Sequence, residues 1–415
     1  MRLSNLYTKT IKDNPSDEQA LNAQLLIRAG FIHKEMSGVY SYLPLGKRVL
    51  DNISEIIKKE MNELGCLEVQ MSSLQPKDIW EITGRWDDKK VDNWFKTKLY
   101  NGQLLGIGLT HEEPVIDSLK SYVDSYKNLP IYVYQIQTKF RNELRAKSGL
   151  LRGREFLMKD LYSFSLNERE HEIFYNKVIK SYNKIYSKLG LGDITYRTYA
   201  DGGIFSKTFS DEFQTLSVAG EDRIYVDEAN KIAINDEIYN DQNLKKLSLD
   251  KKRLVLKKGV EVGNTFSLGS KYTDQLGLYY NDQAGHKQSI IMGCYGIGVS
   301  RLMGVIAEVF ADDRGLNWPT TIAPFKVYLI SINENPKSKE KTEVIYNLLT
   351  RKNIDVLYDD RDMRAGQKFA DADLLGIPYR VVVNQDFEDK QVELKRRNKD
   401  KIEYVQYDRL ESIIS

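Results

Sequence analysis

Hydrophobic residues recur at helical spacing in two stretches near the start of the chain. Within residues 46–64 the apolar side chains form a single stripe, made of Val49, Leu50, Ile53, Ile56, Ile57 and Met61. This stripe predicts an amphipathic helix that ends before Gly65. Residues 16–30 show a similar spacing, and we expect a helix there with Ser16 as its N-cap and Gly30 as its stop.

Short runs of β-branched and aromatic residues follow this helical region. They predict strands at 67–71, 104–109, 131–140, 194–199, 212–218 and 223–226. A longer helical pattern occupies 168–189. Because the strands do not alternate strictly with helices, the pattern favours an antiparallel α+β domain. Residues 227–258 are polar and weakly patterned, and we expect a small excursion too short for a domain.

The pattern changes after residues 311–324, which contain two prolines and no periodicity. Beyond them we expect alternating strands and helices: strand 327–332, helix 338–351, strand 354–358, helix 367–375, strand 379–383, and strands at 391–396 and 402–406. This order predicts a small α/β module. We therefore expect a body over residues 1–320 and a module over residues 325–415.

Composition narrows the function classes without identifying one. The 415 residues include 61 Lys and Arg and 59 Asp and Glu, so a net charge of +2 neither requires nor excludes a nucleic-acid partner. Cys66 and Cys294 are too few for a disulfide framework and favour a reducing compartment, so we expect a cytoplasmic protein. The two cysteines and the four scattered histidines do not have the close spacing that is usual for a zinc site. The chain also lacks an apolar run of about 18 residues and a signal-peptide core, so we expect no membrane association.

One segment is strongly basic. Residues 139–159 contain seven Lys or Arg and two Glu, with a Ser-Gly turn at 148–149 between two expected strands. Arginines on such a hairpin form a multidentate anion site, and a solvated charged hairpin is the alternative. Arg141 and Glu143 are expected on one face of the first strand, which indicates a polar pocket.

Two motifs in this order resemble class II aminoacyl-tRNA synthetases. Phe-Arg-Asn-Glu at 140–143 resembles their motif 2, and Gly-Ile-Gly-Val-Ser-Arg at 296–301, before an apolar helix, resembles their motif 3. The second motif alone is a weak signal. It is neither a Walker loop nor a dinucleotide fingerprint, because the surrounding βαβ unit and the distal acid are absent.

Further matches resemble the bacterial-type prolyl-tRNA synthetases and cover nearly the whole chain except 227–258. They are Thr-His-Glu-Glu at 110–113, the stretch 152–164, Met-Gly-Cys-Tyr at 292–295, Tyr-Asp-Asp-Arg at 358–361 and the stretch 368–378. The resemblance implies an antiparallel-sheet catalytic domain followed by a small α/β anticodon-binding domain, in a homodimer.

The reaction that this resemblance implies is proline–tRNA ligation. L-proline attacks ATP, pyrophosphate leaves, and the prolyl group passes to the 3′-terminal adenosine of tRNA(Pro). Mg²⁺ would accompany ATP, and we expect no structural zinc. The attacking carboxylate is already ionised at pH 7, so positioning and charge stabilisation must supply the catalysis.

By resemblance, Arg141 and Arg301 are the catalytic residues. Arg141 would bridge the proline carboxylate and the α-phosphate, and Arg301 would contact the γ-phosphate. Glu143 would accept from the adenine amino group while Phe156 stacks on the base. The other expected nucleotide-site residues are the phosphate candidate Arg152, the Mg²⁺ ligand Glu212 and the turn glycines Gly296 and Gly298.

For proline itself, Thr110 and Glu112 are the expected ammonium partners and Arg141 the carboxylate partner. Cys294 and Asn264 would line the pocket. Thr110 has a second interpretation as a helix N-cap, with Glu113 completing a capping box, and both can hold together. Cys294 can equally be a small buried hydrophobe, and nothing marks it as a nucleophile.

In the C-terminal module, Arg361 and Lys368 are the candidates for contact with the anticodon bases of tRNA. Residues 325–415 carry 17 Lys and Arg against 17 Asp and Glu, so bulk charge does not identify an RNA-binding module. A solvated charged face remains the alternative for each residue taken singly.

The chain departs from the family pattern in four places. Ser72 stands where the motif 1 proline of the dimer contact is expected, and Asp211 and Asn264 stand where the family usually has histidines. Between Glu221 and Lys258 only about 37 residues replace the large editing domain of many bacterial relatives. We therefore expect no hydrolysis of mischarged alanyl-tRNA by this chain.

Two alternatives remain open. Threonyl-, glycyl- and histidyl-type synthetases share the architecture, although the threonyl type needs zinc ligands that this inventory makes scarce. The second alternative is a synthetase-like binding or regulatory protein that has lost catalysis. Such a protein is expected to have lost Arg141, Glu143 or Arg301, and all three are present.

Overall fold

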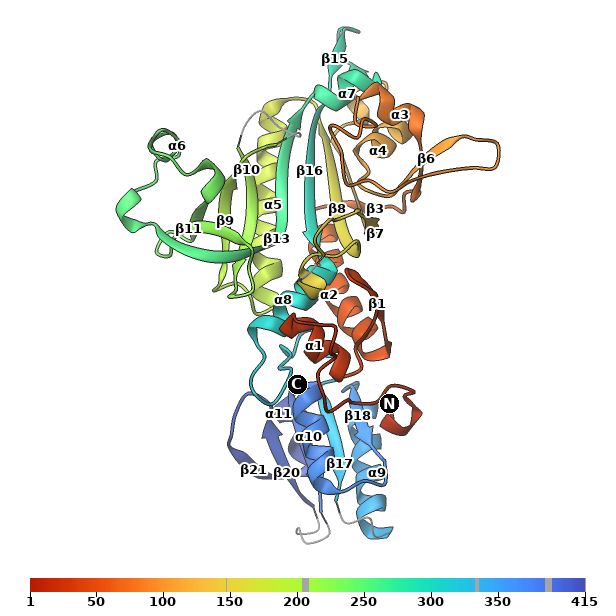
Figure 1. Ribbon diagram of the computed structural model, residues 1–415, viewed down its shortest axis with the longest axis vertical. Coiled ribbons are helices and arrows are strands. Elements are labelled where there is room, and N and C mark those ends of the chain that lie inside the picture. The colour runs from red at the N-terminus through yellow and green to blue at the C-terminus, as the bar shows by residue number, and fades with distance from the viewer. Residues whose placement is uncertain (147, 204–208, 333–335, 385–389, 415) are drawn as a thin grey trace. The chain divides into compact units, whose positions relative to one another are not determined.

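The computed structural model describes residues 1–146, 148–203, 209–332, 336–384 and 390–414 (Figure 1). Lys147, one of the basic residues counted in the expected hairpin, lies outside them. The chain forms two compact units. The first combines Met1–Glu35, Tyr40–Ile53 and Ile306–Ser415, and the second combines Met36–Val39 and Ser54–Val305.

A large sheet forms the centre of the second unit. In the described residues its strands follow the order β10, β9, β12, β11, β13, β16, β8, β7 and β3, and β10 also pairs with β13. All pairs are antiparallel except β12 with β9 and β3 with β7. The bounds are β3 Leu67–Glu68, β7 Ile131–Phe140, β8 Glu155–Ser165, β9 Thr195–Ala200, β10 Ser210–Leu216, β11 Asp222–Asp227, β12 Ile232–Asn235, β13 Val255–Gly269 and β16 Ile291–Gly298. The predicted α+β class is confirmed.

Helix α5 (Glu168–Lys188) runs along this sheet and packs against β8, β13 and β16 (Figure 1). The Asn167 side chain caps it by accepting a hydrogen bond from the backbone N–H of Glu170 at 3.0 Å. Its buried face carries Phe174 and Tyr182 among other apolar residues. The helical pattern predicted at 168–189 is therefore confirmed.

Smaller elements flank the large sheet. Three short helices pack together: α3 Lys77–Ile82, α4 Glu112–Leu119 and α7 Lys271–Leu276. Two small sheets contain β4 Leu74–Pro76, β5 Lys96–Lys98 and β6 Leu104–Ile107, and β14 Tyr279–Asn281 with β15 Lys287–Ser289. The polar excursion at 227–258 contains β12, α6 (Asp241–Lys246) and a small core of Ile234, Ile238 and Leu244.

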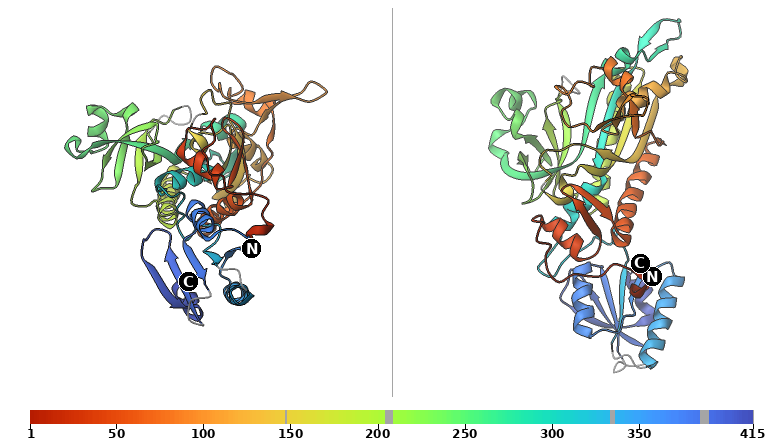
Figure 2. Two further views of the ribbon diagram at one scale, coloured as in Figure 1. Left: turned by 60° about the horizontal axis from the view of Figure 1, so that its bottom comes forward. Right: turned by 45° about the vertical axis from the view of Figure 1, so that its right-hand side comes forward.

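The C-terminal module is a mixed sheet with helices on either side (Figure 2). Its strand order is β18, β17, β19, β20, β21, and the first three run parallel. The bounds are β17 Val327–Ser331, α9 Pro336–Arg351, β18 Val356–Asp359, α10 Ala365–Leu375, β19 Tyr379–Val383, β20 Gln391–Arg396, β21 Ile402–Gln406 and α11 Leu410–Ile414. The predicted strands at 391–396 and 402–406 match β20 and β21.

The start of the chain packs against this module, which the sequence pattern did not predict. Arg2 forms a parallel bridge with Tyr358 in β18. Ser4 donates to Asp360 through its backbone N–H at 2.9 Å and its hydroxyl at 2.6 Å. An N-terminal segment thus covers the edge strand β18.

The first helices differ from the prediction at one end. Helix α1 spans Leu21–Arg28 rather than 16–30, and its N-cap residue Ala20 offers no side-chain bond, so the assignment of Ser16 as the cap was wrong. Gly30, with φ of +71°, follows its end as expected. The remaining elements of the described chain in this region are β1 Ile32–Met36, β2 Val39–Tyr42, α2 Pro44–Glu63 and α8 Val299–Val309.

Gly46 permits a close approach at the start of α2, and its substitution provides a stability test. A Cβ on Gly46 would lie 2.1 Å from the carbonyl oxygen of buried Phe31. We predict that Gly46→Ala lowers the free energy of unfolding by about 1–3 kcal/mol, measured by urea denaturation. Gly366→Ala in α10, where a Cβ meets nothing within 4 Å, is the control and should be neutral or slightly stabilising. Equal stability of the two variants would contradict this account.

Candidate functional site

A first cavity of about 260 Å³ is lined by residues of β8, β13 and α8, by the segment between β7 and β8, and by the segment 219–222 at the start of β11. Five predicted nucleotide-site residues line it: Arg141, Glu143, Arg152, Phe156 and Arg301. Sequence reasoning missed the other lining residues, among them Glu221, Asp222, Gly259 and Glu261. The cavity wall is therefore rich in both arginine and carboxylate groups.

A second cavity of about 320 Å³ contains all five predicted proline-site residues: Thr110, Glu112, Arg141, Asn264 and Cys294. Sequence reasoning missed others in its lining, among them Arg85, Asp160, Met158 and Phe266. Within the described residues, Arg141 is the one residue that lines both cavities. The structure thus brings together two predicted sites around one cation.

The Arg141 side chain is available to a ligand. Its guanidinium carbon lies 5.2 Å from the ring centre of Phe156, a cation–π contact. Across the described parts of the chain, no hydrogen bond or ion pair engages this guanidinium. Burial, followed by the positive charge of Arg301, lowers the pKa of Arg141. A guanidinium in this state is suited to bind an anion.

The reason given for placing Arg141 and Glu143 together was wrong. Strand β7 ends at Phe140, so neither residue belongs to a strand face. The backbone N–H of Arg141 donates to the carbonyl of Arg154 at 2.8 Å, and the N–H of Glu143 donates to the carbonyl of Arg141 at 2.8 Å. A tight turn, not strand alternation, directs both side chains to the first cavity.

Arg152 joins two carboxylates across the first cavity. Its guanidinium lies 3.0 Å from Glu143 and 3.0 Å from Glu221. Asn93 also donates to Glu143, at 3.3 Å. A hydrogen bond from Ser148 and the pairing with Arg152 lower the pKa of Glu221. Glu143, predicted to bind adenine, and Arg152, predicted to bind phosphate, therefore form an ion pair with each other.

The carboxylate of Glu261 lies beside Arg301. Its Nη1 donates to the backbone carbonyl of Glu261 at 2.5 Å and lies 3.6 Å from the carboxylate of that residue. Glu212 is not among the cavity-lining residues; Gln214 links it to Asp222, with bonds of 2.9 Å to each. Burial, followed by the charge of Glu261, raises the pKa of Glu212 to about 8. The structure thus places Glu261 at the cavity and Glu212 behind it.

The glycines of the third motif differ in position. Gly296 lines the second cavity rather than the first, and Gly298 lines neither. Strand β16 ends at Gly298, and a Cβ there would come within 3.0 Å of the Arg301 Cβ. Gly298 therefore allows the close strand-to-helix turn that presents Arg301, and direct nucleotide contact by either glycine is not supported.

Glu112 is the anionic centre of the second cavity. Its side chain is 1% exposed and accepts from the Thr110 hydroxyl at 2.8 and 2.9 Å, from Arg85 at 3.1 Å and from the Cys294 thiol at 3.2 Å. Burial alone would raise the pKa of Glu112, but Arg85 and these hydrogen bonds hold it below its ordinary value. His111, whose side chain makes no capping hydrogen bond, is the N-cap of α4, so the expected Thr110 capping box was wrong.

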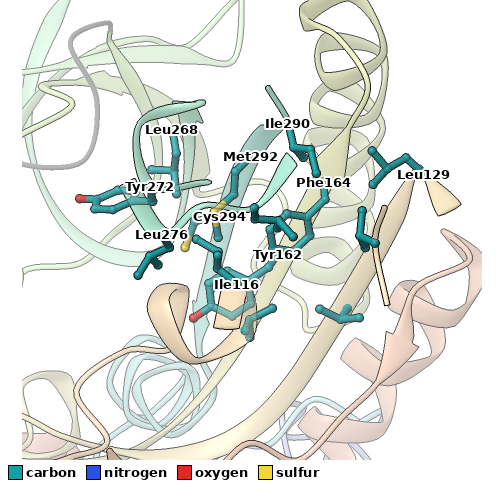
Figure 3. Packing of buried hydrophobic residues seen from close by; sticks show 14 of the residues in the cluster. Ile116, Leu129, Tyr162, Phe164, Leu268, Tyr272, Leu276, Ile290, Met292 and Cys294 are labelled. Carbon is teal, nitrogen blue, oxygen red and sulfur yellow. The ribbon is translucent and has the colours of Figure 1, made fainter. Parts of the chain in front are cut away.

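Cys294 belongs both to the cavity and to the hydrophobic core. It is 8% exposed and packs in a cluster with Met292, Tyr162 and Tyr272 (Figure 3). Burial, followed by the charge of Glu112, raises the pKa of the Cys294 thiol well above its ordinary value. An un-ionised thiol here gives the cavity an apolar wall, in agreement with both interpretations of this residue.

A buried polar network supports the second cavity from behind. Asp160 pairs with Lys139 at 2.8 Å, and Lys139 also lies 2.9 Å from Nδ1 of His111. Burial, followed by the charge of Lys139, lowers the pKa of His111 to about 4, so its ring is neutral near pH 7. With Nδ1 accepting from Lys139, Nε2 donates to the carbonyl of Ser72 at 3.1 Å. This network fixes the backbone between Thr110 and Glu112.

Asn264 and Asp211, which stand where the family usually has histidines, differ in their relation to the cavities. Asn264 lines the second cavity, donates to Glu261 at 2.8 Å and accepts from the N–H of Gly296 at 3.2 Å. Asp211 lines neither cavity and pairs with Arg197 through two bonds of 2.8 Å. Of these two positions, only Asn264 is placed to act on a substrate.

In the C-terminal module, the two anticodon candidates are held by the protein itself. Lys368 is 1% exposed, and its ammonium group donates to the carbonyl of Ser331 at 3.3 Å. Arg361 pairs with Asp359 and Asp371, each at 2.7 Å. Burial of Lys368 corrects its assignment as a base-contacting residue; Arg361 is half-buried.

Two family descriptions match the chain. Residues 95–310 match the tRNA synthetase class II core domain (G, H, P, S and T), and residues 326–415 match an anticodon binding domain. The proline–tRNA ligase of Wolbachia sp. subsp. Brugia malayi is 40% identical, over 98% of this chain and 97% of that protein. The chain belongs to the proline–tRNA ligases. It is a bacterial-type class II aminoacyl-tRNA synthetase, without a large insertion relative to these relatives.

Other members agree with this membership. The proline–tRNA ligase of Rickettsia bellii is 38% identical over 98% of this chain and 96% of its own length. Two solved prolyl-tRNA synthetases share the fold at 17% identity. That of Cryptosporidium parvum, with halofuginone and AMPPNP, has a TM-score of 0.79 and covers 95% of this chain and 75% of that one. That of Giardia lamblia, with prolyl-adenylate, has a TM-score of 0.77 and covers 94% and 75%.

Two features are absent from the described residues. None of the helices is long and apolar enough to cross a bilayer. Within the same residues, no three His, Cys, Asp or Glu side chains are grouped to hold a metal ion.

Burial of Lys368 generates a test of its role. We predict that Lys368→Met lowers the free energy of unfolding by about 1–3 kcal/mol, because backbone carbonyls lose a buried charged donor. Discrimination between tRNAs with cognate and altered anticodons should stay unchanged, measured by aminoacylation kinetics. Exposed Lys399→Met is the control for stability. Lost anticodon discrimination at wild-type stability would restore the contact role.

Proposed function

We propose that the chain activates L-proline with ATP to prolyl-adenylate and then transfers the prolyl group to the 3′-terminal adenosine of tRNA(Pro). The observation that carries this proposal is the position of Arg141 in the linings of both cavities. Adenylate formation joins a carboxylate to a phosphate, so both substrates must place an anion at the same point. A cation shared by two adjoining cavities meets that requirement.

In the proposed first step, one oxygen of the ionised proline carboxylate attacks the α-phosphorus and pyrophosphate leaves. Negative charge accumulates on the phosphate oxygens in the transition state. Arg141 donates to the carboxylate and to the α-phosphate, and so aligns the reactants and stabilises this charge. No side chain has to remove a proton from the nucleophile.

The first cavity is proposed to hold ATP. Arg301 contacts the γ-phosphate, Phe156 stacks on adenine, and Glu143 accepts from its amino group. Arg152, the second phosphate candidate, bridges Glu143 and Glu221 before ATP arrives. Because its side chain is half exposed, Arg152 can exchange these partners for phosphate oxygens at a small energetic cost.

Mg²⁺ is proposed to accompany ATP at the carboxylate side of the first cavity. Mg²⁺ in nucleotide sites takes one or two carboxylates together with phosphate oxygens, so it does not require a protein-only cage. Glu261 faces the cavity, and Glu212 is close enough for the two negative charges to disfavour each other, a repulsion that a cation would relieve. These two residues would hold the ion, which would neutralise phosphate charge.

The second cavity is proposed to hold proline. Thr110 and Glu112 bind its secondary ammonium, and Arg141 binds its carboxylate. Cys294 and Asn264 line the rest of the pocket, with Phe266 and Met158 as apolar neighbours of the ring. An ionised Glu112 matches the permanent positive charge of this ammonium near pH 7.

The remaining assignments concern assembly and partners. We propose residues 1–320 as the catalytic domain and 325–415 as the anticodon-binding domain, with Arg361 as a tRNA contact. A homodimer is proposed through the motif 1 region, because edge strand β3 carries exposed Leu67, and Leu74 nearby is also exposed. Both cysteines are buried free thiols, which supports a cytoplasmic location.

Arg141→Ala tests the proposed chemistry. We expect proline-dependent ATP–pyrophosphate exchange to fall by at least about 100- to 1,000-fold, because transition-state charge loses its main partner. Exposed Arg169→Ala in α5, outside both cavities, is the control and should retain exchange. An active Arg141→Ala variant would remove the assigned role. If the wild type binds tRNA but shows no exchange with any amino acid, a non-catalytic synthetase-like protein becomes the better description.

The short excursion at 227–258 leads to a prediction about editing. Proline and alanine differ by little apolar bulk, and such differences discriminate by only about 10–200-fold. We expect this chain to form alanyl-tRNA(Pro) slowly and not to hydrolyse it. Incubation of the protein with purified alanyl-tRNA(Pro) measures this directly, with buffer alone as the control. Deacylation well above the buffer rate would contradict the prediction.

A further inference from the structure

Three charged side chains are buried together beside the second cavity. Arg85 follows α3, whereas Glu112 and Glu113 are adjacent residues in the first turn of α4. Nη1 of Arg85 donates to Glu112 at 3.1 Å and to the two oxygens of Glu113 at 3.2 and 3.0 Å. Glu113 is fully buried and does not line the cavity, whereas Arg85 and Glu112 do. We call these three residues the acidic triad.

The surroundings of the acidic triad fix its geometry. The Thr83 hydroxyl donates to Glu113 at 2.8 Å. The guanidinium of Arg85 also contacts two aromatic rings, 5.0 Å from the centre of Trp80 and 5.5 Å from that of Tyr272. Aromatic faces and two carboxylates thus enclose one cation, which leaves Arg85 little freedom to move.

The charge of the acidic triad is unbalanced. One arginine faces two carboxylates, so the fully ionised group carries one net negative charge out of contact with water. Such a charge is costly unless a cation neutralises it. The other charged lining groups of the cavity are Lys90, Asp92, Asp160 and Arg141, and Asp160 is already paired with Lys139. A ligand with a positive charge next to Glu112 would supply the missing partner.

We propose that Arg85 and Glu113 are positioning residues for the proline ammonium: they orient Glu112 and leave the acidic triad with one negative charge, which that ammonium neutralises. This inference rests on the proposed function of the second cavity. Glu113 is essential to it, because Arg85 alone would neutralise Glu112 and remove the net attraction for the ammonium. Thr110 and Glu112 contact the substrate, whereas Arg85 and Glu113 act through Glu112.

Proton uptake by the empty acidic triad supports this inference. Burial, and then the charge of Glu112 working against that of Arg85, raises the pKa of Glu113 to about 7. The groups that face Glu113 are Arg85, Glu112, the Thr83 hydroxyl and Tyr272 from α7, and burial keeps Tyr272 un-ionised. As pH falls through this value, Glu113 takes up a proton and the empty triad approaches neutrality. Proline binding there should expel that proton, so affinity should increase as pH rises to about 7 and then level off.

The experiment is calorimetric titration of the full-length protein with L-proline in the absence of ATP. Omitting ATP separates the measurement from Glu212, which lies behind the first cavity and whose pKa is raised to about 8. Titration at pH 6.5 in buffers with different ionisation enthalpies gives the number of protons released. We expect the wild type to release a fraction of a proton per proline and Glu113→Gln to release none, with a Kd raised about tenfold.

Arg85 variants test the charge balance. Arg85→Met leaves two buried carboxylates without a cation, and we expect the Kd for proline to rise about 10- to 100-fold. The double variant Arg85→Met/Glu113→Gln restores one net negative charge and should recover most of that loss. A merely structural role for Arg85 predicts no such recovery. Arg197→Met, which removes a partly buried arginine from Asp211 outside both cavities, should leave the Kd unchanged.

A second ligand separates the ammonium from the rest of proline. Tetrahydrofuran-2-carboxylate replaces the ring ammonium by an oxygen atom, so its weaker binding should change little among these variants. Wild-type proton release lost in Glu113→Gln, together with rescue in the double variant, would establish the inference. Proline binding by Arg85→Met at the wild-type Kd, or unchanged proton release in Glu113→Gln, would overturn it. If wild-type protein binds no proline and supports no proline-dependent exchange, the proposed function fails as well.

Discussion

A guanidinium that is enclosed by protein but has no hydrogen-bond or ion-pair partner can bind an anion from outside. Arg141 is in this position, because within the described residues neither a carboxylate nor a carbonyl engages its side chain, and Arg301 lies close enough to lower its pKa. The surrounding strands supply the enclosure: β7 ends just before it, and β8, β13 and β16 carry the cavity walls. The long antiparallel sheet is thus the scaffold that holds one unsatisfied cation between two cavities.

The two cavities on either side of Arg141 differ in the charged groups that line them. In the proposed function the first cavity receives a polyanion, and it contains Arg301 and Arg152, each beside a carboxylate. The second is proposed to receive a zwitterion, and its lining contains both Arg141 and the buried Glu112. Because burial strengthens charge interactions, small displacements of these groups should matter more than additional contacts elsewhere. The hydrogen bonds behind the two cavities, such as those of Gln214 and of Lys139, hold these groups in place.

Sequence patterns predicted this scaffold well wherever the signal was local. The strands predicted at 131–140, 391–396 and 402–406 match the bounds of β7, β20 and β21 in the structure. Residues brought in from elsewhere were missed. Arg85 carries no local motif and becomes a site residue only because α3 packs on α4, and Glu261 becomes one because β13 borders the first cavity. Burial also reversed one expectation: Lys368 resembles a surface cation in the sequence, but its ammonium group is enclosed by backbone carbonyls.

The departures from the family pattern acquire different meanings once their partners are known. Asp211 has a complete set of protein partners in Arg197 and Tyr175, so its carboxylate has little left to offer a ligand. The amide of Asn264 instead donates to Glu261 and accepts from the N–H of Gly296, and Asn264 lines the second cavity. A neutral amide at this position links a carboxylate of the first cavity to the strand that carries Cys294. Any effect of these departures on substrate choice should therefore arise through Asn264, and through the orientation of Glu261 as much as through direct contact.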